Sequence, residues 1–282
     1  DIDAVIAGFA RCAKVLKEAG FTGVQLHSAH GYLLSQFLSP RSNQRTDRWG
    51  GSLENRARAL LESVNAVRAA VGPEFPVGVK LNSADFQRGG FDFTESLQVA
   101  KWLEAAGVDL LEISGGTYEQ PRLLNVEGIE PIENQAIAQS TRAREAYFVD
   151  FAQAMRKELT MPLMVTGGLR RLDAMESALE SGSADVVGIG RPMCVMTDAP
   201  KRLLAGMEQL PRYEDALSLL PRWLKILEKI SLFKTLGTFA VQYWYYEQIL
   251  LLGEQGKTSD DLSVFAATRR QMKLANDLAA AR

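Results

Sequence analysis

Residues 96–116, SLQVAKWLEAAGVDLLEISGG, combine the two local patterns that decide the fold. The first part, Ser96 to Ala106, has the spacing of an amphipathic helix and is followed by Gly107, a residue typical of helix C-termini. The next run, 108–113, is short and almost continuously apolar, as in a strand that is covered on both faces. The stretch therefore predicts a helix that leads into a buried parallel strand.

The same helix–strand unit occurs four more times. The predicted strands cover residues 24–27, 77–82, 109–114, 163–166 and 185–189. Alternating helices and buried strands predict an α/β fold with a parallel sheet. We favour a TIM-type (β/α)8 barrel over a doubly wound sheet. Polar or glycine residues follow several strands, and the Gly-x-Gly-x-x-Gly turn of a dinucleotide-binding sheet is absent.

The pattern changes near Lys201, beyond which no strand signal remains. We predict a partial barrel over residues 1–205 and a helical C-terminal extension over residues 206–282. The extension contains Trp223, Leu224, Leu227, Ile230, Phe233 and the aromatic cluster Tyr243-Trp244-Tyr245-Tyr246. It either covers barrel helices, which we favour, or forms contacts in a homo-oligomer.

Composition excludes several classes of protein. The 282 residues include 32 basic and 34 acidic ones without a basic stripe, which argues against nucleic-acid binding. Polar residues interrupt the most apolar stretch, Leu236 to Leu252, so we predict no membrane span there. The N-terminus does not resemble a secretory signal, and Cys12 and Cys194 fit buried thiols in a reducing cytoplasm.

The two histidines of the chain, His27 and His30, lie three residues apart just after a predicted strand. A His-x-x-His pair alone is weak evidence. It could be half of a metal site, although no third ligand has a telling spacing, and one histidine could be a core residue. Neither alternative explains the whole segment around the pair.

That segment reads GVQLHSAHGYLLSQFLSP over residues 23–40 and continues as NQRTDRWGGSLENR over residues 43–56. Here the sequence resembles the Old Yellow Enzyme family, and specifically its bacterial NADH:flavin oxidoreductase branch. The similarity extends through the later strands to about Pro192, and the ordered set of motifs is far more specific than any one of them.

The resemblance implies an oxidoreductase that carries FMN. NADH or NADPH would reduce the flavin, and an electron-poor alkene of the enone type would reoxidise it by accepting hydride at its β-carbon. His27 and His30 match the pair that hydrogen-bonds the activating oxygen of the substrate, in the manner of an oxyanion hole. Tyr32, five residues after His27, matches the proton donor, and a phenol stays protonated at neutral pH until the substrate carbanion needs the proton.

The resemblance also implies the residues that bind the flavin. Lys80 aligns with a basic residue against the flavin pyrimidine edge, and its alternative role is an ion pair with Glu112 on the next strand. Gly167-Gly168 and Gly190-Arg191 match the phosphate site, where backbone N–H groups and a guanidinium bind phosphate. The predicted set is completed by Ser114 and Gly115, and no metal site is expected.

The five strands correspond to strands four to eight of the family's barrel. We therefore expect three strands to be missing from this chain, together with part of the flavin site. A second hypothesis follows, in which the chain is a truncated, inactive barrel that serves as an assembly or flavin-binding module.

Overall fold

The computed structural model describes residues 1–116, 147–220 and 231–280. They form two compact units, one of residues 1–169 and 173–188 and the other of residues 170–172 and 189–282. The predicted domain boundary after residue 205 stays a prediction.

The first unit alternates helices with strands, in the predicted order. Its elements are α1 (Ile2–Glu18), β1 (Val24–Ser28), α2 (Leu33–Leu38), α3 (Leu53–Val71), β2 (Val77–Asn82), α4 (Phe93–Ala105), β3 (Leu110–Ser114), α5 (Tyr147–Arg156), β4 (Leu163–Thr166), α6 (Leu172–Glu180) and β5 (Val186–Gly188). Two of the longer helices begin where a side-chain oxygen accepts a backbone N–H: Ser52 caps α3 and Asp92 caps α4.

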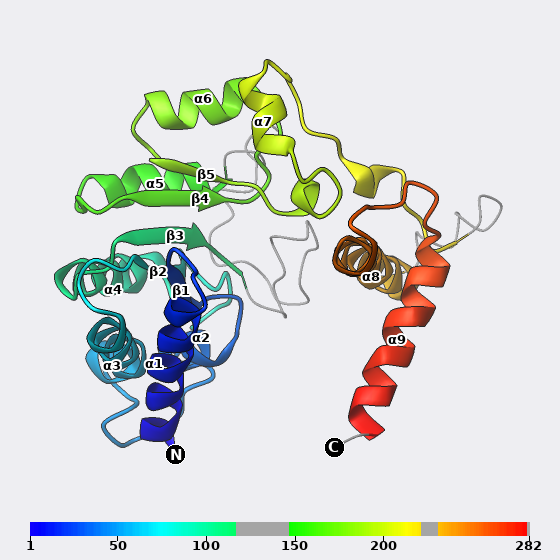
Figure 1. The fold of residues 1–282 in the computed structure, drawn as a ribbon. Helices are drawn as coiled ribbons and strands as arrows, with labels where there is room; N and C mark the ends of the chain where they lie inside the picture. Colours follow the sequence, from blue (N-terminus) through cyan, green and yellow to red (C-terminus); the bar gives the residue numbers. More distant parts are fainter. Residues whose placement is uncertain (117–146, 221–230, 281–282) are drawn as a thin grey trace. The chain divides into compact units, whose positions relative to one another are not determined.

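The five strands form one parallel sheet in the order β1-β2-β3-β4-β5 (Figure 1). The five predicted strands and their parallel arrangement are confirmed, with ends that differ by at most one residue. The order of the strands follows the sequence without a reversal, whereas a doubly wound sheet reverses at its switch point. The strand order is that of consecutive strands in a barrel wall.

The two faces of the sheet differ in chemistry. Side chains on the helix-covered face are apolar and almost fully buried, among them Val79, Leu111 and Val165. The other face corresponds to a barrel interior and carries polar side chains, among them Lys80 and Glu112. This alternation places the polar groups of successive strands side by side.

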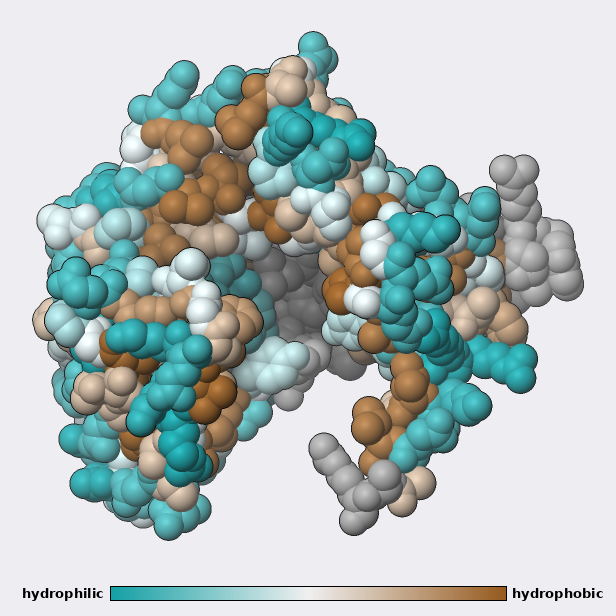
Figure 2. Space-filling model, viewed as in Figure 1, coloured by the Kyte–Doolittle hydropathy of each residue, from teal (hydrophilic) through white to brown (hydrophobic). Residues whose placement is uncertain are grey.

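Within the described residues, β1 and β5 each pair with one strand. The β5 side chain of Val186 is 40% exposed, and Figure 2 shows hydrophobic surface over the region of α6 and β5. An apolar strand edge of this kind is a site where further strands can pair.

The second unit is helical. It contains η4 (Arg191–Cys194), α7 (Ala199–Leu204), η5 (Tyr213–Asp215), α8 (Ser231–Gln255) and α9 (Val264–Ala280). Its core lies between α8 and α9 and contains Trp244, Tyr245 and Val264. The predicted extension residues Trp223, Leu224, Leu227 and Ile230 lie outside the described residues, as does the side chain of Phe233.

The two cysteines differ in their exposure to solvent. Cys12 is exposed on α1, so the prediction that it is buried is wrong, and Cys194 is half-buried; both are free thiols. Cys12 lies on the polar side of the amphipathic helix α1. Its apolar side chain suggested burial, but its position on the helix determines its exposure. None of the described helices is long and apolar enough to cross a membrane.

Candidate functional site

A row of neighbouring residues on β1, β2 and β3 forms the base of the candidate site. The strand register pairs His27 with Lys80 and Lys80 with Glu112. Laterally paired residues of a parallel sheet project from the same face, so Lys80 lies between an imidazole and a carboxylate. The Lys80 Nζ–Glu112 Oε1 distance is 2.8 Å, and both side chains are largely buried.

The turn after β1 is held by the ends of the next two strands. His30 adopts φ 61°, a conformation that is uncommon for a residue other than glycine. Its backbone N–H donates to Asn82 Oδ1 (3.1 Å), and its Nε2 lies 2.6 Å from Ser114 Oγ. Asn82 is held in turn, because its amide donates to Asp85 Oδ1 and to the Gly116 carbonyl. Strained backbone that is fixed from several sides is frequent at functional sites.

Both imidazoles are uncharged at neutral pH. Burial, and then the positive charge of Lys80, lowers the pKa of His27. Burial, and then the positive charge of Lys80, lowers the pKa of His30 to about 3. Because the Ala29 N–H donates to His27 Nδ1 (3.1 Å), neutral His27 carries its proton on Nε2. His27 can therefore donate a hydrogen bond from Nε2 without carrying a fixed charge.

Tyr32 lies next to the histidine pair. Its ring centroid is 4.9 Å from that of His27, and the two imidazole centroids are 5.0 Å apart, with both pairs edge to face. The Tyr32 side chain is 46% exposed and sits at the N-terminus of α2. The structure thus brings the three predicted catalytic side chains together in one turn, with Tyr32 about half exposed.

The predicted flavin-binding residues fall into both units. Lys80 forms an ion pair with Glu112, which is the alternative role expected for it from the sequence. Its contact with flavin stays a prediction. Ser114 contacts His30, a partner that the sequence did not indicate. At Gly115 an added Cβ would lie 2.7 Å from the ring of Phe86, so the close packing requires glycine.

The glycine turns at the later strands are in the predicted places. Gly167 and Gly168 directly follow β4 and adopt φ 136° and 76°, values that favour glycine strongly. Gly190 and Arg191 follow β5 in sequence and belong to the second unit. Arg191 Nη1 lies 2.8 Å from Glu214 Oε1.

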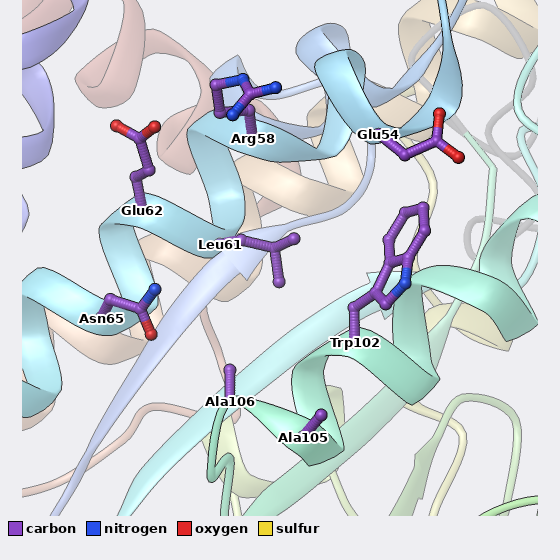
Figure 3. Close-up of a pocket in the computed structure, with 8 residues that line it drawn as sticks. All are labelled: Glu54, Arg58, Leu61, Glu62, Asn65, Trp102, Ala105 and Ala106. Carbon is purple, nitrogen blue, oxygen red and sulfur yellow. The ribbon is translucent and has the colours of Figure 1, made fainter.

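A separate cleft of about 600 Å³ lies between α3 and α4 (Figure 3). Leu61, Trp102 and Ala105 form its apolar part, while Glu54 and Glu62 are among its polar lining. It lies on helices of the outer layer and contains none of the predicted site residues. Within the described part of the chain, no group of three or more His, Cys, Asp or Glu side chains could hold a metal ion.

Comparison with known proteins identifies the family. Residues 1–209 match the model of the NADH:flavin oxidoreductase / NADH oxidase family. The chain belongs to this family.

Curated and solved relatives agree with the assignment. An NADH-dependent flavin oxidoreductase (iccE) of Talaromyces variabilis is 42% identical over 209 residues, which are 74% of this chain and 49% of the relative. A 2-naphthoyl-CoA reductase in complex with 2-naphthoyl-CoA has a TM-score of 0.64 at 32% identity, over 76% of this chain and 30% of the reductase. The old yellow enzyme homologue of Zymomonas mobilis has a TM-score of 0.58 at 25% identity, over 76% of this chain and 55% of the homologue.

These comparisons confirm the predicted Old Yellow Enzyme resemblance, the α/β barrel class and an oxidoreductase family that uses FMN and a nicotinamide reductant. The chain spans about half, or less, of the length of the relatives described.

Several residues of the site were not predicted from the sequence. Asn82 was predicted only as the last residue of the strand 77–82, and Glu112 only as an alternative partner of Lys80. An acidic residue in an otherwise apolar strand was the available signal for Glu112, because buried carboxylates are rarely unpaired. No pattern in the sequence indicated Glu214.

Proposed function

We propose that the whole protein is an FMN-dependent oxidoreductase that reduces electron-poor alkenes of the enone type with NADH or NADPH. The observation that carries the proposal is the cluster of His27, His30 and Tyr32, in which both imidazoles are neutral. We place the reaction in the cytoplasm, where the free thiols of Cys12 and Cys194 would stay reduced.

The described residues supply the donors that this reaction needs. His27 holds a proton on Nε2, and a neutral donor can bind a carbonyl oxygen and stabilise the negative charge that develops on it. The contacts of His30 with Asn82 and Ser114 fix the second imidazole before a substrate arrives. The Tyr32 ring packs edge to face against His27, and its hydroxyl would supply the proton to the substrate carbanion.

The donor set of the chain also fits FMN. FMN, when bound, supplies the hydride. Lys80 is a cation on the sheet face that carries His27, and it would lie against the flavin ring. Gly167, Gly168 and Gly190 would let backbone N–H groups approach the phosphate, and Arg191 would add a positive charge.

The cofactor is tested first, on the full-length protein. We expect it to purify with a non-covalent flavin that chromatography identifies as FMN. Release of FAD, or a protein that stays colourless after FMN is added, would contradict the proposal.

The role of Tyr32 is tested by Tyr32→Phe in rapid-mixing experiments. We expect alkene reduction to slow by roughly 10²-fold or more, the size of a general-acid contribution, while reduction of the flavin by NADH stays unchanged. Tyr246→Phe is a matched control, since Tyr246 is 44% exposed and lies on α8. Equal rates of alkene reduction in Tyr32→Phe and the unmodified protein would remove Tyr32 as proton donor.

A further inference from the structure

One carboxylate in the second unit binds three side chains that come from separate segments. Glu214 of η5 accepts a hydrogen bond from Arg170 Nη2 (2.9 Å) through Oε1, and the same oxygen forms an ion pair with Arg191 Nη1 (2.8 Å). Its Oε2 accepts from the hydroxyl of Tyr245 on α8 (2.7 Å). Glu214 and Tyr245 both belong to the predicted helical extension, whereas Arg191 belongs to the predicted phosphate site.

The two arginines differ in how accessible they are. The Arg170 side chain is only 6% exposed, while that of Arg191 is 30% exposed. A buried guanidinium needs a paired charge, so Arg170 and Glu214 form the fixed base of the cluster. Arg191 is the member that solvent can reach.

The cluster keeps a net positive charge. Burial opposes ionisation of Glu214. Its pKa is nevertheless lowered overall, because Tyr245 and a backbone group donate hydrogen bonds to it and both arginines carry positive charge. One ionised carboxylate therefore faces two guanidinium groups. The remaining charge suits an anion such as phosphate.

We propose that Glu214 and Tyr245 are positioning residues that hold the Arg191 guanidinium ready for the phosphate of FMN. This inference rests on the proposed function. It gives the helical extension a role within the flavin site, in place of simple coverage of the barrel.

The geometry explains why such support is useful. A guanidinium has five N–H donors, and Glu214 engages Arg191 through Nη1, which leaves donors for a second anion. A free arginine side chain loses rotamer entropy when it becomes fixed, and a side chain already held loses less on binding. Among the described residues, no atom lies within 4 Å of a Cβ added at Gly190, the residue before Arg191.

An alternative role of Glu214 would have the opposite effect on the affinity for FMN. It could neutralise Arg191 and compete with phosphate, in which case removing the carboxylate would strengthen FMN binding. Under our proposal its removal weakens FMN binding, because Arg191 loses its anchor.

The test compares FMN with riboflavin, which has the same ring system but no phosphate. Full-length protein is stripped of flavin, and both affinities are measured from the quenching of flavin fluorescence. For Glu214→Gln we expect the Kd of FMN to rise about tenfold or more, as for loss of a charge-assisted contact, and the Kd of riboflavin to stay within about twofold. Tyr245→Phe should give a smaller rise for FMN alone.

A matched control is Glu254→Gln, because Glu254 also pairs with an arginine of the second unit, Arg270, but at the surface. It should change neither affinity. Since Glu214→Gln leaves Arg170 buried without its partner, the double variant Arg170→Met/Glu214→Gln removes both buried charges and should fold with less loss of stability. It should weaken FMN binding in the same way.

The outcomes separate the inference from the proposed function. If the unmodified protein binds neither flavin, the proposed function fails. If the unmodified protein binds FMN no better than riboflavin, or if FMN binding in the double variant is unchanged or tighter, the positioning role is wrong. Equal weakening of FMN and riboflavin would also overturn it, because that result indicates general damage to the fold.

Discussion

The neutral state of His30 predicts a specific dependence of stability on pH. Replacing His30 by Asn removes the titrating group, and asparagine tolerates the φ of 61° better than most residues do. The folded state keeps His30 uncharged down to a pKa of about 3, while the unfolded chain binds a proton near pH 6.5. Stability from the neutral imidazole is therefore complete above pH 6.5 and is lost as the pH falls towards 3.

The magnitude follows from these two pKa values. Between pH 7.5 and pH 5 the unfolded state gains almost one proton at His30 and the folded state gains almost none. At about 1.4 kcal/mol for each pH unit below 6.5, His30 lowers the free energy of unfolding by about 2 kcal/mol at pH 5. The result changes little if the pKa in the folded state is one unit higher, because that value is still below pH 5.

Urea denaturation of the full-length protein at the two pH values measures this effect. The loss of stability on going from pH 7.5 to pH 5 should be about 2 kcal/mol smaller in His30→Asn than in the unmodified protein. His27→Asn is the comparison variant and should show a smaller effect of the same sign, because burial and Lys80 also lower the pKa of His27. An unchanged pH dependence in His30→Asn would show that His30 is not held neutral in the folded state.

Two further substitutions test the packing and the charges of the site. Gly115→Ala should lower the free energy of unfolding by about 1–3 kcal/mol, because the new Cβ would lie 2.7 Å from the ring of Phe86. The control is Gly8→Ala, which should not destabilise the protein, because among the described residues its Cβ would approach a side-chain atom of Arg11 no closer than 4.0 Å. Equal stabilities of the two variants would contradict the close packing at Gly115. Glu112→Gln should cost about 3 kcal/mol because it leaves Lys80 largely buried without its partner. Most of this loss should be recovered in Lys80→Met/Glu112→Gln, and a double variant as unstable as the single one would argue against the ion pair.

The sequence by itself determined the fold class and the position of the turn that carries the histidine pair. Apolar runs such as 110–113 mark strands because local spacing decides which side chains can be buried together. The five strands were predicted to within one residue of their observed ends. The histidine motif was readable for a related reason, since His27, His30 and Tyr32 lie within six residues and a single turn brings them together.

Only the tertiary structure decided which groups those residues meet. Strand register placed Lys80 beside Glu112, and the ends of two later strands placed Asn82 and Ser114 against His30. The pKa of His30 depends on burial and on the charge of Lys80, neither of which a local pattern contains. Glu214 reaches Arg170 across 44 residues of sequence. Contacts over such distances depend on how the whole unit packs, and for that reason the sequence could not predict them.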